Sequence, residues 1–140
     1  MWGSHLIKSW SSTQSVIALS SGEAEYYGIV KGASVGMGLK AVLKDFEVEA
    51  TITIKSDATA AIAIASRRGL GKVRHIEVCQ LWLQERVRQG EIKVEKVNTS
   101  ENAADALTKY VSRSIMDMHI SVTNQGARGG RHSLAPATEY

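Results

Sequence analysis

The sequence predicts an α/β domain in which at least part of the sheet is parallel. Two short segments, residues 51–56 and 91–97, alternate apolar and polar side chains, as half-buried strands do. Segments with apolar residues at helical spacing lie before and between them, and strands that alternate with helices are typical of parallel sheets. The domain is predicted to cover residues 1–120. Residues 121–140 are rich in Gly, Ser, Thr and Ala and have little periodicity, which predicts a flexible tail.

The domain is predicted to begin with a strand and a long helix. Residues 5–13 mix apolar and polar residues with β-forming types, which predicts the first strand. Ser20 and Glu23 have the S-x-x-E spacing of a capping box, in which each side chain accepts a hydrogen bond from an amide that the helix start leaves without a partner. The helix is predicted to run from there to about Phe46.

The long helix combines an apolar stripe with regularly spaced glycines. The stripe has helical spacing and consists of Tyr26, Val30, Ala33 and Met37. Gly28, Gly32 and Gly36 lie four residues apart and so form one ridge. Each glycine costs about 1 kcal/mol relative to alanine in a helix interior. A weak or broken helix is one explanation. Close packing of another backbone against the ridge is favoured, because the apolar stripe continues through the glycines.

The second half of the domain is predicted to alternate helices and strands. Asp57 follows the first alternating segment and is a candidate N-cap for an alanine-rich helix at 58–66. Residues 75–90 predict an amphipathic helix. Its predicted apolar face consists of Ile76, Cys79, Leu83 and Val87. Beyond the second alternating segment, capping residues predict a short helix around Asp105, which residues 112–120 extend or follow.

Composition excludes several classes of protein. Cys79 is the single cysteine, which excludes an internal disulfide and fits a reducing compartment. We therefore expect an intracellular protein, cytoplasmic or nuclear. Four histidines are too scattered to form a zinc site with one cysteine. No apolar run approaches the roughly 18 residues that a membrane span needs, so no membrane insertion is expected.

A basic segment between two predicted helices is a candidate contact for nucleic acid. The net charge is +3, and residues 67–74 contain four basic side chains and no acid. These side chains are Arg67, Arg68, Lys72 and Arg74. Together with the glycines between them, they suit a loop that follows a phosphate backbone. A solvated loop that only keeps the protein soluble is the alternative.

Three carboxylates stand at positions where catalytic acids occur. Glu25 lies in the first turns of the long helix, where Glu23 already meets the needs of capping. Asp57 lies at the carboxyl end of a predicted strand, where α/β sheets tend to place ligands. Asp105 follows the last predicted strand. Asp57 has helix capping as an alternative role, and Asp105 has that of an ordinary surface acid.

Four segments in series resemble a known family. LSSGEAEY, IKSDATAAIAIA, RHIEV and NAADALTK resemble the ribonuclease H domain at the end of the polyprotein of copia-class LTR retrotransposons, in order and in spacing. The resemblance extends from about residue 5 to about residue 120. It implies the ribonuclease H-like fold, a mixed sheet of five strands flanked by helices, here without the first strand and most of the second.

The resemblance also implies an activity. Members of this family cleave the RNA strand of an RNA–DNA hybrid with two divalent metal ions held by four carboxylates, usually Mg²⁺ and with Mn²⁺ as an alternative. It assigns catalysis and metal binding to Glu25, Asp57 and Asp105, and the four basic loop residues to substrate binding. His75 is expected to be structural. Trp82 is expected to lie in the core, with base stacking as the alternative.

One part of the family pattern has no counterpart in this chain. The family's first carboxylate lies on the first strand, in the middle of the sheet. We expect a fragment, a homodimer or partner chain that completes the sheet and supplies the acid, or a rearranged remnant. The remnant would be catalytically inactive and would act as a nucleic-acid-binding, protein-interaction or structural module. A different α/β hydrolytic enzyme is not supported, because no motif pairs the single cysteine with a histidine.

Overall fold

The computed structural model describes residues 1–71 and 76–126. The chain divides into two compact units, and each is described by itself below. The larger unit is Ser11–Asn102, and the smaller unit combines Met1–Trp10 with Ala103–Tyr140. The predicted domain at 1–120 thus contains elements of both units. Most of the predicted tail, residues 127–140, lies outside the described residues.

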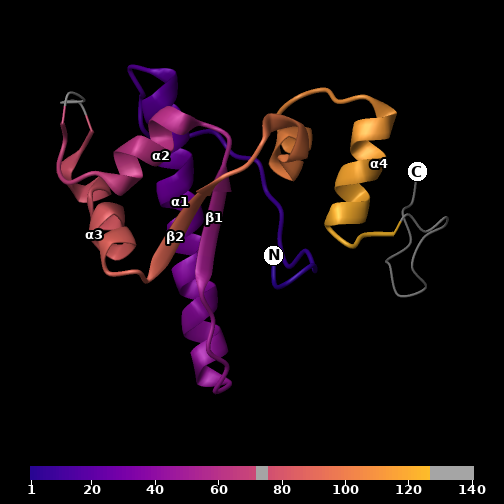
Figure 1. Cartoon of the computed structure of the whole chain (residues 1–140), viewed down its shortest axis with the longest axis horizontal. Helices are drawn as coiled ribbons and strands as arrows, with labels where there is room; N and C mark the ends of the chain where they lie inside the picture. The colour runs from indigo at the N-terminus through magenta and orange to yellow at the C-terminus, as the bar shows by residue number, and fades with distance from the viewer. Residues whose placement is uncertain (72–75, 127–140) are drawn as a thin grey trace, which may run out of the picture. The chain divides into compact units, whose positions relative to one another are not determined.

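The larger unit alternates helices with two parallel strands, as predicted (Figure 1). Its regular elements are α1 Ser21–Asp45, β1 Ile52–Ser56, α2 Thr59–Ser66, the 3-10 turn η1 Val78–Gln80, α3 Trp82–Arg88, β2 Ile92–Lys96 and the 3-10 turn η2 Thr99–Glu101. The strands pair in register from Ile52 opposite Ile92 to Ser56 opposite Lys96. The α/β prediction is therefore confirmed. A mixed sheet would need an antiparallel neighbour, and within the described residues neither strand has one.

The long helix begins as its sequence predicts. Ser20 has extended backbone angles, and its hydroxyl accepts a hydrogen bond from the Glu23 amide at 3.2 Å. The Glu23 carboxylate reaches back and accepts from the Leu19 amide at 2.8 Å, one residue before the position that a standard capping box uses. Two amides at the helix start are thereby satisfied, and the helix runs to Asp45 with Phe46 as its C-cap.

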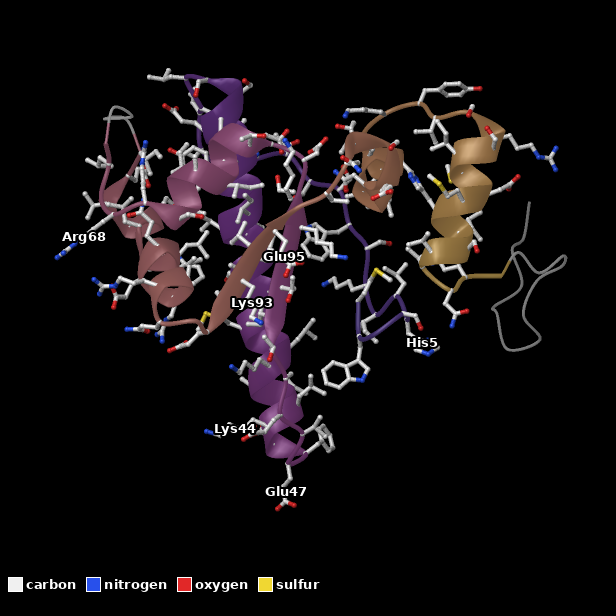
Figure 2. All side chains as sticks on the ribbon, in the orientation of Figure 1. His5, Lys44, Glu47, Arg68, Lys93 and Glu95 are labelled. Atoms are coloured by element: carbon white, nitrogen blue, oxygen red, sulfur yellow. The ribbon has the colours of Figure 1, made fainter. Side chains whose placement is uncertain are left out.

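The core of the larger unit lies between α1, α2, α3 and one face of the sheet. Its fully buried large side chains are Tyr26, Leu83 and Ile92. The predicted stripe of α1 faces this core, with Met37 packed against its edge, and Trp82 also packs against it as expected. The opposite face of the sheet exposes polar side chains, among them Lys93 and Glu95 (Figure 2).

Helix α1 runs antiparallel to β1, and two glycines mark the contacts. A Cβ at Gly36 would lie 3.0 Å from Cγ2 of Ile52, at the start of β1. A Cβ at Gly22 would lie 3.0 Å from Cβ of Ala60, in the first turn of α2. The prediction of close packing is therefore correct at Gly36. It is wrong at Gly28 and Gly32, where an added Cβ would meet none of the described atoms within 4 Å.

Two predicted elements differ from the structure. Residues 6–14 contain no regular structure, and His5 only forms an isolated bridge to Trp2. A strand needs a neighbour that pairs with its backbone, and none of the described residues provides one. The predicted helix at 75–90 is instead η1 followed by α3, and Cys79 is exposed. The Gln80 carbonyl accepts a hydrogen bond from the Tyr26 hydroxyl at 2.8 Å. This carbonyl is therefore engaged by α1 and not by the backbone of a continuous helix.

The smaller unit contains short helical elements. The predicted short helix around Asp105 is the 3-10 segment η3 Ala103–Leu107, and α4 Arg113–Val122 follows as a separate helix. The buried side chains that the structure describes in this unit are those of His119 and Thr123. The Thr123 hydroxyl donates to the His119 carbonyl at 2.7 Å and so closes the end of α4. Across both units, the described helices include none with the length and apolar character that crossing a membrane requires.

Candidate functional site

Two glutamates in the first turns of α1 have different surroundings. Glu23 is 3% exposed, and its carboxylate is occupied by the Leu19 amide. Glu25 is exposed, and its carboxylate has no hydrogen bond or ion pair with any residue that the structure describes. Capping therefore accounts for Glu23, and Glu25 remains available for a ligand.

Asp57 follows β1 directly and does not cap the next helix. The N-cap of α2 is Ala58, which makes no side-chain cap, and the Ser56 hydroxyl accepts from the Ala58 amide at 3.2 Å. The partly buried Asp57 carboxylate has no hydrogen bond or ion pair within residues 1–71 and 76–126. Its expected alternative role as a helix cap is therefore excluded.

The fold brings Glu25 and Asp57 to the same end of the sheet. Asp57 stands at the carboxyl end of β1, where the Val97 amide donates to the Ser56 carbonyl at 3.0 Å. The N-terminal turn of α1 lies against the first turn of α2 through Gly22 and Ala60. Glu25 lies three residues after Gly22, which places it on the flank of the same helix face. Two carboxylates that have no partner among the described residues therefore stand at the edge where α/β sheets place ligands.

Asp105 belongs to the smaller unit and already has a partner. The Lys109 ammonium lies 2.9 Å from its Oδ2, and the Lys109 amide donates to its carbonyl at 2.8 Å. The Asp105 side chain is 16% exposed, against 59% for Lys109. A metal ion at Asp105 would have to compete with this ammonium, so the third predicted acid differs from the other two.

The donor set fits magnesium in part. Mg²⁺ takes hard oxygen ligands and keeps several waters, so one or two carboxylates are enough to bind it. Glu25 and Asp57 meet that requirement. Within the part of the chain that the structure describes, no three His, Cys, Asp or Glu side chains are grouped so as to hold a metal ion.

The predicted basic loop is described only at its start. Arg68 is exposed and points away from the larger unit (Figure 2). Arg67 is half-buried, and its guanidinium donates to the Leu70 carbonyl, so part of this side chain holds the loop together. Lys72, Arg74 and His75 lie outside the described residues.

Gln84 holds the beginning of this loop and was not predicted. It is 8% exposed, and its amide nitrogen donates to the carbonyls of Ile64 at 2.9 Å and Gly69 at 3.1 Å. Its amide oxygen accepts from the Gly69 amide at 2.7 Å. In the sequence, Gln84 is a polar residue next to the apolar Leu83 on a short helix. This pattern does not distinguish a buried glutamine from one that faces solvent. Burial decides that Gln84 fixes where the basic loop leaves α2.

Lys96 is a second residue that the pattern did not reveal. It pairs with Ser56 at the end of the sheet, one residue before Asp57, and its ammonium donates to the Thr59 hydroxyl at 2.6 Å. A cation thus stands beside the carboxylate edge. Alternation in a strand predicts which face a lysine takes, but not which neighbouring helix start it reaches.

Tyr26 connects the site to the core. Burial raises the pKa of its hydroxyl to about 12, although the Arg67 charge acts in the opposite direction. The neutral hydroxyl donates to the Gln80 carbonyl, and this bond holds the turn before α3 against the helix that carries Glu25.

Comparison with known proteins identifies one relative. The chain is 32% identical over 113 residues, which is 79% of its length, to a protein described as "Retrovirus-related Pol polyprotein from transposon TNT 1-94" of Nicotiana tabacum. The sequence is similar to part of a retrotransposon polyprotein. It spans 8% of the length of that relative. No family model matches the chain, and no solved structure is significantly similar to it.

This similarity supports a retroelement origin of the chain, as the four sequence segments predicted. The relative's description names a polyprotein and does not name a ribonuclease H domain. The similarity therefore extends to the retroelement origin and does not show the domain identity, its metal ions or its substrate.

Proposed function

We propose that this chain is the ribonuclease H-like part of a retroelement polyprotein and hydrolyses the RNA strand of RNA–DNA hybrids. The observation that carries the proposal is the pair of carboxylates, Glu25 and Asp57, at one end of the sheet and without partners among the described residues. Asp57 is partly buried, and a partly buried carboxylate without a partner is costly, which favours a ligand at this position. The four-segment resemblance and the polyprotein relative support the same assignment.

Glu25 and Asp57 would hold the divalent ions, with Asp105 as the third ligand once it leaves Lys109. Two such ions, when bound, supply charge stabilisation at the attacking and leaving oxygens of an in-line displacement. The family's fourth carboxylate has no match in these 140 residues, so a further segment or chain would contribute it.

The remaining role of this chain is to position the hybrid. Arg68 stands on the exposed loop, and Lys96 lies beside the carboxylate edge. Lys72, Arg74 and the rest of the basic loop would add further phosphate contacts. Such contacts give binding that depends on salt and little on sequence, while hybrids are distinguished by shape and by their 2′-hydroxyl groups.

Cleavage of a hybrid with a labelled RNA strand tests the proposal. The full chain is incubated with hybrid and Mg²⁺, beside Asp57→Asn and an EDTA control. Asp57→Asn keeps the shape of the side chain and removes the charge that would hold the metal. The expected loss exceeds the roughly 10–100-fold that removing an outer-shell partner of a metal site costs.

Asp117→Asn is the matched control, because Asp117 is an exposed acid on α4 outside the proposed ligand set. It should cleave like the unmodified chain. Cleavage that survives EDTA, or an Asp57→Asn variant as active as Asp117→Asn, would contradict the assignment.

Binding without catalysis is the second candidate function, and the ion pair between Lys109 and Asp105 favours it. An Asp105 that is paired with Lys109 is less available to a metal ion. The chain as a whole is basic, with a net charge of +3, and could bind a phosphate backbone without metal. A binding module should retain the hybrid in EDTA and should not respond to Asp57→Asn. The same variant therefore separates the two functions when binding and cleavage are both measured.

A further inference from the structure

The outer face of α1 is apolar and lies away from the core of the larger unit. An α-helix turns by about 100° per residue. Five residues of α1 and its C-cap residue therefore lie on one strip of the helix surface, away from the stripe that faces the core. We call this strip the outer seam; it consists of Gly28, Gly32, Val35, Leu39, Val42 and Phe46. The larger side chains are open to solvent, with exposed fractions of 41% for Leu39, 52% for Val42 and 73% for Phe46.

The glycines of the outer seam have no role within the described residues. A Cβ added at Gly28 or Gly32 would meet none of the described atoms within 4 Å. Glycine weakens a helix interior relative to alanine, and here the weakening has no packing reason inside the larger unit. A glycine on a helix face does, however, allow another helix to approach closely.

The outer seam is complementary to itself. Small residues occupy its N-terminal half and large residues its C-terminal half, which extends past the start of β2 in Figure 1. If a second copy of α1 lies antiparallel, Gly28 meets Phe46 of the copy and Gly32 meets Val42 of the copy. Val35 then meets Leu39 of the copy. All three pairs are centred on position 37, which is the symmetry that a two-fold interface requires.

Charge beside the outer seam has nearly the same symmetry, with its centre at position 38, one residue from the centre of the seam. Lys31 and Asp45 lie on the same flank of the seam, and both are exposed. Neither has an ion pair with any residue that the structure describes. They are about 21 Å apart along one helix at 1.5 Å per residue, too far to pair with each other. In the antiparallel arrangement Lys31 stands beside Asp45 of the second copy, and the two-fold repeats the contact.

We infer that the chain forms a two-fold dimer in which the outer seams of two α1 helices pack antiparallel. The occupant is a second copy, because both the order of small and large side chains and the order of the charges complement themselves. The inference does not depend on the proposed nuclease activity, because none of the proposed metal ligands belongs to the outer seam. Small residues facing large ones allow close approach of the helices and bury apolar side chains that the single chain leaves in water.

The first test places a large side chain in the small half of the outer seam. Analytical sedimentation compares Gly32→Leu with Ser34→Leu in the full chain. Protein concentrations of about 1 to 100 µM are used, because micromolar dissociation constants can be measured at these concentrations. Ser34 is exposed on α1 about 200° around the helix from Gly32. Both variants add the same side chain, but only Gly32→Leu blocks the partner. We expect its dissociation constant to rise at least about 10-fold, and that of Ser34→Leu to stay unchanged.

The second test reverses the charges beside the outer seam. Lys31→Asp and Asp45→Lys each place like charges together and should weaken the dimer, whereas the double variant should restore it. Because the two side chains cannot meet within one helix, restoration reports contact between copies. Circular dichroism confirms that each variant is folded. A chain that stays monomeric at the highest concentration, a dimer indifferent to Gly32→Leu, or charge reversals without restoration would each overturn the inferred dimer.

Discussion

The two units of the chain bury different kinds of side chain. Among the described residues, the larger unit buries eleven apolar side chains between its helices and its sheet. Within its described residues, the smaller unit buries His119 and Thr123 and no apolar side chain to the same extent. Its helix α4 leaves Ile115, Met116 and Met118 between 38% and 39% exposed.

This difference shows which of the proposed ligands stand on elements that are held in place by a buried apolar core. Apolar burial contributes roughly 25 cal/mol per Å² and is the main favourable term in folding, while an isolated helix of ten residues is marginal in water. Glu25 and Asp57 stand on elements that share a core. Asp105 stands on a 3-10 segment of the smaller unit, whose described residues form no apolar core, so the proposed ligands have unequal support.

The largest expected effect contrasts one core residue with one residue of α4. Leu83 is fully buried, so Leu83→Ala should lower the free energy of unfolding by about 2–5 kcal/mol. Met116 is 38% exposed, so Met116→Ala should change it by less than about 0.5 kcal/mol. Urea unfolding followed by circular dichroism measures both. Equal losses would show that the smaller unit depends on apolar packing as much as the larger one.

Alkaline pH should destabilise the larger unit through Tyr26. The pKa of its hydroxyl is about 12 in the folded chain and 10.0 in the reference state. The neutral form is therefore favoured by folding, and its contribution is complete below pH 10 and is lost as the pH rises through 12. Since one pKa unit corresponds to about 1.4 kcal/mol, the loss amounts to roughly 2–3 kcal/mol.

Tyr26→Phe should remove this part of the pH dependence of unfolding between pH 10 and pH 12. Tyr110 belongs to the smaller unit and is fully exposed, so Tyr110→Phe is the matched control and should behave like the unmodified chain. If both variants kept the same alkaline slope, burial of Tyr26 would not be its source. The burial of Tyr27 also raises the pKa of its hydroxyl, so a residual slope in Tyr26→Phe is expected.

Replacing Gln84 should release the start of the basic loop. Gln84→Leu keeps the apolar packing but leaves the Gly69 amide and the Ile64 carbonyl without this partner. A buried polar group without a partner costs about 1–3 kcal/mol. Hydrogen exchange at the Gly69 amide should accelerate by a corresponding factor. Gln89→Leu, at an exposed position of the same segment, should leave that exchange unchanged, and an equal response would contradict the role of Gln84.

The smallest effect is expected in the smaller unit. Lys109→Ala removes the ion pair between Lys109 and Asp105, which lie four residues apart in the sequence. Such pairs contribute about 0.3–0.5 kcal/mol when both side chains are exposed; because the Asp105 side chain is only 16% exposed, the contribution here should be at most about 1 kcal/mol. The free energy of unfolding should therefore change by no more than that amount, as it should for Lys93→Ala on the exposed face of the sheet. A loss above about 1 kcal/mol would mean that the ion pair, rather than apolar burial, holds the smaller unit together.

The predictions from sequence succeeded where neighbours in the chain decide the outcome. Ser20 caps α1 because its hydroxyl and the Glu23 amide lie within one turn. The two alternating segments form parallel strands because an α/β order leaves few other arrangements. Of the candidate site, the positions of Glu25 and Asp57 at helix and strand ends were also readable from local pattern.

What the sequence by itself determined is therefore the identity and order of α1, β1, α2 and β2, since capping, alternation and helical spacing act over a few residues. It did not determine the segments at 5–13 and 75–90, where the structure differs from the prediction. Only the tertiary structure decided that Gly36 meets Ile52 while Gly28 meets no other described part of the chain, and that Gln84 is buried. It also decided that Ser56, rather than Asp57, satisfies the amide before α2. These outcomes depend on which distant segment approaches each side chain. Local periodicity carries no information about that approach, because it is set by the packing of whole elements.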